Sequence, residues 1–97
     1  MTLTFTKKNS PTEQDFYKRL LDGLKYKGDF GNNLDALYDL LTEPRPNFRI
    51  YIKDADFSSA YGGRGEAILQ VLKDSCEESG CFTLKIRTKR RRLWQVK

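Results

Sequence analysis

Two aspartates four residues apart carry the clearest chemistry in this sequence. Asp35 and Asp39 lie in the stretch from residue 28 to residue 43, which holds four acids and no lysine or arginine. On a helix, this spacing places both side chains on one face. Carboxylates there would accept strong, often bidentate hydrogen bonds from arginine and lysine side chains. The stretch therefore indicates either a solvated polar face or an acidic patch that docks a cationic partner.

The two aspartates differ in how easily the fold alone explains them. Asp35 would stand near the helix N-terminus, where its charge interacts favourably with the helix dipole. Asp39 has no lysine or arginine three or four positions away, and a like charge at this spacing costs about 0.2–0.5 kcal/mol. Costs of this size are commonly tolerated. The pattern alone thus favours the solvated face and leaves the docking patch open.

The composition argues against an enzyme or a metal site. The chain contains no histidine, which removes the usual general base near neutral pH and the commonest metal ligand. A catalytic aspartate pair would need a pocket and a raised pKa on one member, and an exposed helix face offers neither. Cys76 and Cys81 lack further zinc ligands, so we expect reduced packing residues. We expect no catalytic residues, no bound metal and no cofactor.

The C-terminal end has the opposite charge. From residue 82 to residue 97 there are seven bases and no acid, in a chain whose net charge is +5. A run of bases beside an aromatic side chain is the combination that neutralises phosphates and stacks on nucleobases. A solvated end or a strand extension is the alternative. The candidate residues for nucleic-acid binding are Lys89, Arg90, Arg91, Arg92 and Trp94.

Length and composition limit the class of protein. The 97 residues allow one domain with one small core. With 38% hydrophobic and 32% charged residues, the chain is typical of soluble globular proteins. No apolar run approaches the roughly 20 residues of a transmembrane helix, and the N-terminal residues lack the order of charge and apolar run found in a secretory signal. We therefore expect a cytoplasmic protein that does not enter a membrane.

Capping patterns and hydrophobic periodicity predict the elements that position these residues. Ser10, followed by Pro11 and Glu13, has the form of a capping box, and Asn33 can cap a second helix. Gly80 can end a third. In chain order, we expect a strand at 3–5, a helix at about 11–24, a helix between Asn33 and Pro44, a strand at 48–53, a short helical piece around 54–60, a helix through 67–76 and a strand at 82–87.

The order of these elements predicts the fold class. Strands separated by helical crossovers favour a parallel sheet with right-handed connections. Because the predicted strands alternate polar and apolar residues, we expect helices mainly on one face of the sheet. The prediction is an α/β protein with two layers, in which a three-stranded parallel sheet packs against about four helices.

The run FGNNLDALYDLLT at residues 30–42 resembles the signature of the barstar family of ribonuclease inhibitors. That signature is an aromatic residue, glycine, any residue, then Asn-Leu-Asp-Ala-Leu, an aromatic residue and Asp. Residues 67–72 resemble the last helix of the family, and the resemblance covers about residues 1–88. It implies a barstar-like inhibitor domain over residues 1–88, and it leaves residues 89–97 as a basic C-terminal tail or strand extension.

The resemblance also implies a mechanism. In that family, the helix with the acids plugs the active site of a secreted bacterial ribonuclease. By position, Asp39 would mimic a substrate phosphate and Asp35 would bind near the catalytic loop of the nuclease, while Asn33 and Tyr38 would add hydrogen bonds and an aromatic wall. The implied partner-binding residues are Asp29, Phe30, Gly31, Asn33, Asp35, Tyr38, Asp39, Thr42 and Asp74.

Two hypotheses of different classes follow. The first is a non-enzymatic immunity protein of the bacterial cytoplasm, bound 1:1 to a secreted ribonuclease or a nuclease toxin domain, with neither a nucleic-acid nor a membrane partner. The second is a nucleic-acid-binding module that uses the basic C-terminal segment. They differ in which charges matter, the acids at 35 and 39 or the bases at 89–92.

Overall fold

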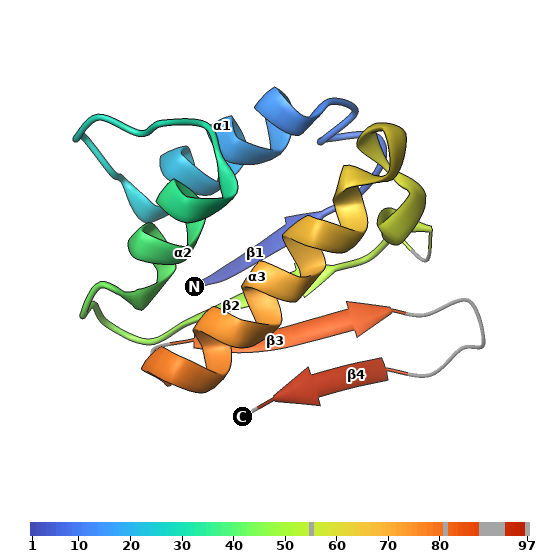
Figure 1. Cartoon of the computed structure of the whole chain (residues 1–97). Coiled ribbons are helices and arrows are strands. Elements are labelled where there is room, and N and C mark those ends of the chain that lie inside the picture. Colours follow the sequence, from blue (N-terminus) through green and yellow to red (C-terminus); the bar gives the residue numbers. More distant parts are fainter. Residues whose placement is uncertain (55, 81, 88–92, 97) are drawn as a thin grey trace.

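The computed structural model of the chain describes residues 1–54, 56–80, 82–87 and 93–96. Its helices and strands alternate in the order that the sequence predicts (Figure 1). The elements are β1 (Thr2–Phe5), α1 (Glu13–Leu24), α2 (Leu34–Thr42), β2 (Phe48–Ile52), the 3₁₀ turns η1 (Phe57–Ser59) and η2 (Tyr61–Gly63), α3 (Arg64–Ser79), β3 (Phe82–Arg87) and β4 (Leu93–Val96).

The strands form one sheet in the order β1-β2-β3-β4. The first three strands are parallel, as predicted, and their register aligns Leu3 with Ile50 and Ile50 with Leu84. At the far edge β4 runs antiparallel to β3. The division into a domain at residues 1–88 and a basic end at residues 89–97 stays a prediction.

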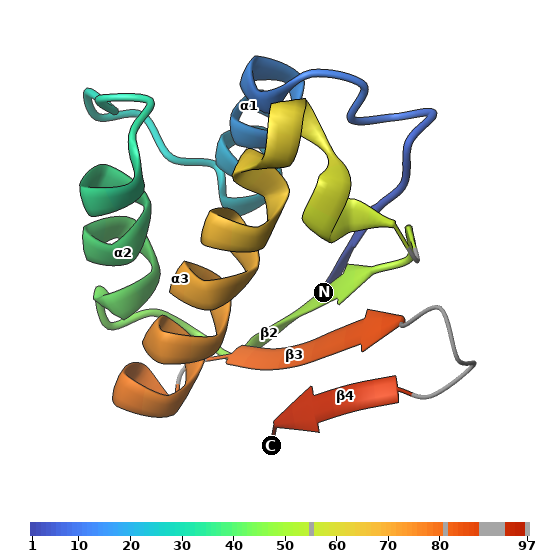
Figure 2. The ribbon, with the colours of Figure 1, turned by 45° about the vertical axis from the view of Figure 1, so that its right-hand side comes forward.

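The helices cover one face of this sheet, which confirms the two-layer prediction (Figure 2). Along β2 the side chains of Phe48, Ile50 and Ile52 are buried, whereas Arg49 between them is exposed. Helices α1 and α3 contact the strands, and α2 packs against α3. The core therefore lies between the sheet and the helices, and the other face of β1 to β3 carries no helix of the described residues.

The fourth of the predicted helical pieces is a 3₁₀ turn rather than an α-helix. The described residues hold three α-helices, and the region of the predicted short helical piece contains the single turns η1 and η2 instead. Tyr61, Gly62 and Gly63 have positive φ values of 56°, 66° and 94°. Between η1 and η2, Ala60 has an extended backbone with a ψ of 156°, which separates the two turns.

Helix α1 begins two residues later than predicted because its cap is Thr12 rather than Ser10. The Thr12 hydroxyl oxygen accepts the Asp15 N–H at 3.1 Å, as an N-cap does. Ser10 is instead buried, and its carbonyl oxygen accepts the Tyr61 hydroxyl at 2.7 Å. A hydroxyl residue therefore caps α1 as predicted, but it is Thr12 rather than Ser10.

A bidentate ion pair joins the first turns of α1 and α3. The Nε and Nη2 atoms of Arg64 donate to the two carboxylate oxygens of Glu13 at 2.6 and 3.0 Å. The Tyr17 hydroxyl donates to the same carboxylate at 2.9 Å, and burial, followed by this bond, raises the pKa of Tyr17 to about 12. Nothing in the local sequence pattern predicted this link, because its partners are 51 residues apart.

Replacing Glu13 with glutamine should remove an acid-sensitive part of the stability. The hydrogen bond from Arg64 is the main cause that holds the pKa of Glu13 below its ordinary value of 4.5. The charged carboxylate therefore stabilises the folded state above that value, and the contribution disappears as the pH falls through the lowered pKa. Urea unfolding should show Glu13→Gln less stable than wild type near pH 7, with the difference shrinking towards about pH 3.

Glu66→Gln, in the first turn of α3, is the charge-matched control for this measurement. Glu66 is exposed and makes no ion pair with another described residue. A difference between wild type and Glu13→Gln that stays constant across the pH range would contradict the assignment, because it would show a packing effect rather than a titration.

Candidate functional site

Helix α2 carries the two aspartates that the sequence singled out, and Asn33 caps it as predicted. The Asn33 side-chain oxygen accepts the Ala36 N–H at 2.8 Å, and the Asn33 backbone is extended at φ −140°. The preceding Asn32 has a φ of 51°, a left-handed conformation that asparagine tolerates better than most residues. The pair of asparagines thus turns the chain sharply into the helix.

The apolar side of α2 determines where the aspartates point. Leu37, Leu40 and Leu41 are buried in the core, and the helix packs against α3. Asp35 and Asp39 are spaced four residues apart on another face, so both are exposed. Burial of three leucines thereby holds two carboxylates in solvent on a helix that cannot rotate without exposing its apolar side.

The carboxylates of Asp35 and Asp39 have no ion-pair or hydrogen-bond partner within the part of the chain that the structure describes. The side chain of Asp29, in the loop before α2, is also exposed. These three exposed carboxylates, which have no side-chain partner among the described residues, are named the acidic patch. None of the three carboxylates forms an ion pair with a base of the described residues.

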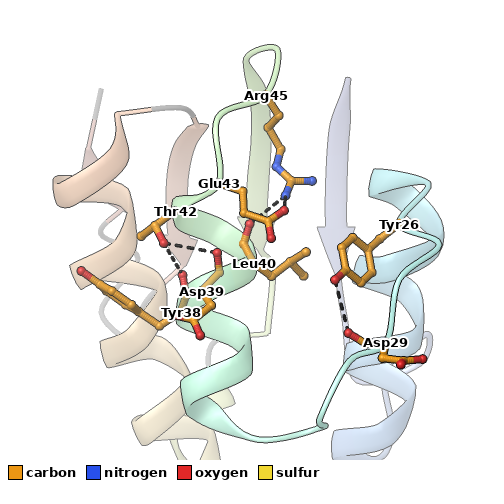
Figure 3. A network of polar contacts seen from close by, with 8 residues as sticks. All are labelled: Tyr26, Asp29, Tyr38, Asp39, Leu40, Thr42, Glu43 and Arg45. Atoms are coloured by element: carbon orange, nitrogen blue, oxygen red, sulfur yellow. Dashed lines mark hydrogen bonds and ion pairs between the residues drawn. The ribbon is translucent and has the colours of Figure 1, made fainter.

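The loop between α1 and α2 is tied to the core at its aromatic residues (Figure 3). The Tyr26 hydroxyl donates to the Asp29 carbonyl oxygen at 3.2 Å. The ring of Phe30 packs on that of Tyr17, with centroids 5.3 Å apart, and the Asn33 amide donates to the Gly31 carbonyl at 3.2 Å. Phe30 is therefore partly a core contact, while Asp29 and Gly31 stay exposed.

Thr42 and Tyr38 lie further along α2. The Thr42 hydroxyl donates to the carbonyl oxygens of Tyr38 and Asp39 at 2.9 and 3.2 Å, so the helix backbone already uses that group. Tyr38 is half-buried, and its ring extends on the side of α3 (Figure 3). These two residues border the acidic patch rather than extend its charge.

Arg45 secures the C-terminal end of α2, a role that the sequence analysis missed. Its Nη2 atom donates to the Leu40 carbonyl at 2.8 Å and to the Glu43 carboxylate at 3.0 Å (Figure 3). A cation at a helix C-terminus interacts favourably with the helix dipole and satisfies a free carbonyl. The available signal was a basic residue just after the last helical turn, enclosed by two prolines at 44 and 46.

The remaining candidates are separate from α2 in sequence. Asp74 is exposed on α3, and it accepts the Gln70 amide at 2.9 Å. The bases at 89–92 lie outside the described residues. Trp94 belongs to β4, whose backbone pairs it with Ile86. The acids Asp29, Asp35 and Asp39 thus lie on α2 and the loop before it, whereas the C-terminal candidates for nucleic-acid binding stay untested.

The acidic patch lines neither of two hollows on the described surface. Two surface hollows of about 590 and 430 Å³ lie elsewhere, and neither is lined by α2. Within the described residues, no group of three or more acids or cysteines could hold a metal ion, and no helix is long and apolar enough to cross a membrane. The three carboxylates are exposed on the surface.

Cys76 lies on the buried side of α3, and its thiol donates to the Phe82 carbonyl at 3.1 Å. Burial raises the pKa of this thiol, which makes it a weaker nucleophile near neutral pH. This agrees with the packing role predicted for it, whereas Cys81 lies outside the described residues.

A family model described as Barstar (barnase inhibitor) matches residues 1–96, which is nearly the whole chain. Among curated proteins and among solved structures, no match was found. The family match includes the loop, α2 and α3, and therefore every residue of the acidic patch.

Proposed function

Because the chain belongs to the barstar family, we propose that it inhibits a barnase-type ribonuclease by covering the cationic active site of that enzyme with α2. The observation that carries the proposal is the pair of exposed aspartates, Asp35 and Asp39, without a partner among the described residues on a helix anchored in the core. The protein itself performs no chemistry. It acts by binding more tightly than the substrate does.

Asp39 is the proposed phosphate mimic. An enzyme that cleaves RNA holds the phosphate with arginine and lysine side chains, and a carboxylate accepts the same charge-assisted hydrogen bonds as a phosphate oxygen. Asp35, one helical turn earlier, would bind near the catalytic loop of the nuclease. The helix holds the two carboxylates at a constant separation, so they can bind two cationic groups of the nuclease at the same time.

Preorganisation of α2 lowers the cost of binding. The Asn33 cap secures one end of the helix, the Arg45 contact secures the other, and buried leucines hold the middle. Little backbone freedom is then lost when the helix enters the nuclease, so more of the interaction energy appears as affinity. Such preorganisation favours a tight inhibitor over a weak, transient contact.

The other candidates have supporting roles in the proposal. Asn33 and Gly31 would offer polar groups at the start of α2, Tyr38 would supply an aromatic wall, and Thr42 would lie at the rim. Asp29 and Phe30 belong to the same surface through the loop, with Phe30 anchored on Tyr17. Asp74 on α3 would be a peripheral acidic contact.

The partner in this proposal is a secreted ribonuclease or a nuclease toxin domain, bound 1:1, and the protein is its immunity factor in the bacterial cytoplasm. The net charge of +5 would repel a basic nuclease at long range. Salt screens that repulsion beyond about 8 Å at physiological ionic strength. At contact the local acidic patch dominates, so the total charge does not oppose the final docking step.

A capture experiment with two proteins tests the proposal. Wild-type protein and the isosteric, uncharged variant Asp35→Asn/Asp39→Asn are immobilised and exposed to lysate and culture medium of the source organism. We expect the wild type alone to retain a ribonuclease, to silence it in an RNA cleavage assay, and to form a 1:1 complex by native mass spectrometry. Equal retention by both proteins, or no retained nuclease that the wild type inhibits, would contradict the proposal.

A further inference from the structure

The face of the sheet opposite the helices presents a basic surface within the described residues. On β2 the outward positions are Arg49 and Tyr51, and on β3 they are Thr83, Lys85 and Arg87. The register places Arg49 beside Thr83 and Tyr51 beside Lys85. Because adjacent strands are about 4.8 Å apart, these side chains form one continuous surface, which we name the open sheet face.

The charge on the open sheet face is of one sign. Among the outward positions of β1 to β3, three are basic and none is acidic, the β1 residues being Thr2 and Thr4. Arg49, Lys85 and Arg87 make no ion pair with another described residue. The bases are not directly opposite one another across the strands, which limits their mutual repulsion.

Protection of a sheet edge does not account for these bases. Proteins often place lysines on edge strands to prevent pairing with another chain. Both β2 and β3 are interior strands, each with a neighbour on either side. A surface that carries unpaired cations in the middle of a sheet is better explained by an anionic partner that lies across the strands.

Tyr51 narrows the chemistry of that partner. It is half-exposed, stands between the outward residues Arg49 and Lys53 along the chain, and pairs in register with Lys85. An aromatic ring among cations is the arrangement that binds single-stranded nucleic acid, since bases stack on the ring while phosphates meet the charges. A duplex, whose bases already stack on one another, would use the charges but not the ring.

A hollow continues this face at the amino ends of the strands. It measures about 590 Å³ and is lined by Arg49, Thr2, Thr83 and Asn47, among others. These side chains offer a guanidinium, hydroxyls and an amide, which can all donate hydrogen bonds to phosphate or ribose oxygens. The hollow is therefore suited to a nucleotide next to one that stacks on Tyr51.

We propose that the open sheet face binds single-stranded RNA, with phosphates at Arg49, Lys85 and Arg87 and one base stacked on Tyr51. This activity goes beyond inhibition and does not depend on it, because the acidic patch lies on α2 and its preceding loop, among the helices that cover the other face of the sheet (Figure 2). An inhibitor with such a face could remain on RNA while α2 is free to meet a nuclease.

Fluorescence anisotropy with a labelled oligouridylate, in the absence of any nuclease, tests the proposal. For Arg49→Gln/Lys85→Gln/Arg87→Gln we expect at least tenfold weaker binding and a slope of log affinity against log salt that is lower by about 2, since each phosphate contact contributes about 0.7. For Tyr51→Thr, which preserves strand preference, we expect about fivefold weaker binding or more with an unchanged slope.

Controls separate this proposal from its rivals. Asp35→Asn/Asp39→Asn should bind RNA at least as tightly as wild type, and circular dichroism should show every variant folded. Should the triple variant unfold, Arg49→Gln alone still provides the test, with a slope lower by about 0.7. Equal binding of duplex or anionic vesicles with no effect of Tyr51→Thr would overturn the proposal. So would a loss confined to a variant with glutamines at 89–92.

Discussion

Asp39→Ala abolishes tight inhibition of the nuclease and leaves the protein folded. This is the largest effect that we expect from any single substitution on α2. If Asp39 occupies the phosphate site, its removal leaves arginine and lysine side chains of the nuclease buried without a counter-charge. Truncating one partner of such a buried charge pair costs about 2–5 kcal/mol, which weakens the inhibition constant by about 30-fold to several thousandfold.

The fold should tolerate this substitution because Asp39 supports nothing internally. Its carboxylate is exposed and has no partner among the described residues. Alanine is the best helix former, and one acidic neighbour at this spacing is removed. We therefore expect the urea midpoint of Asp39→Ala to equal or exceed that of wild type, so that loss of inhibition is not caused by loss of structure.

Inhibition constants from RNA cleavage assays would measure the effect, with Asp22→Asn as the control. Asp22 is an exposed acid on α1 that lines a hollow with Asn9 and Arg19 rather than the acidic patch. Asp22→Asn removes one negative charge, as Asp39→Ala does, so this control reveals any effect of the total charge on inhibition. Unchanged inhibition by Asp39→Ala, or an equal loss in Asp22→Asn, would disprove the assignment of the site.

Gly65→Ala destabilises the protein, although helix propensity alone predicts the reverse. Gly65 lies in the first turn of α3, where alanine would be favoured over glycine by about 1 kcal/mol. In the folded chain, however, a methyl group at this position would overlap the carbonyl group of Phe57 in η1. A backbone group cannot rotate away as a side chain can, so α3 or the turn must move.

The balance of these effects determines the expected sign. Overpacking of a well-packed site costs about 1–3 kcal/mol, which exceeds the gain from propensity. For a domain of this size, each 1 kcal/mol shifts the melting temperature by about 4–8 °C, so thermal unfolding should show a clear decrease for Gly65→Ala. Glu66→Ala, at the exposed neighbouring position, is the control in which propensity acts without the overlap, and it should be neutral or slightly stabilising. A higher melting temperature for Gly65→Ala would contradict the packing argument.

Most of the local structure was predictable from the sequence because it depends on neighbours along the chain. The Asn33 cap bonds to a backbone group three residues later, and the stripe of Leu37, Leu40 and Leu41 is a pattern within one helix. The strands at β2 and β3 follow from alternation over five or six residues. Each of these signals acts over a few residues, so the linear order contains it.

The structure departs from the sequence predictions where two local signals competed, or where contacts between residues far apart in the chain determined the local structure. Ser10 and Thr12 are both residue types that cap helices. In the structure Thr12 is the cap, and the carbonyl of Ser10 accepts a hydrogen bond from Tyr61, which is 51 residues away. The predicted short helical piece around residues 54–60 contains the 3₁₀ turn η1, whose Phe57 carbonyl lies against Gly65 of α3. Neither contact is visible in a local window of sequence.

The candidate site divides in the same way. The sequence by itself determined that Asp35 and Asp39 share one face of a helix, because their spacing matches the helical period. Only the tertiary structure decided that this face is exposed without partners among the described residues, that Arg45 secures the end of the helix, and that the bases at 49, 85 and 87 share a sheet face that no described helix covers. Those facts depend on which surfaces are buried in the core. The core combines residues that are far apart in the chain, and the register between the strands that carry them is not specified by any single segment.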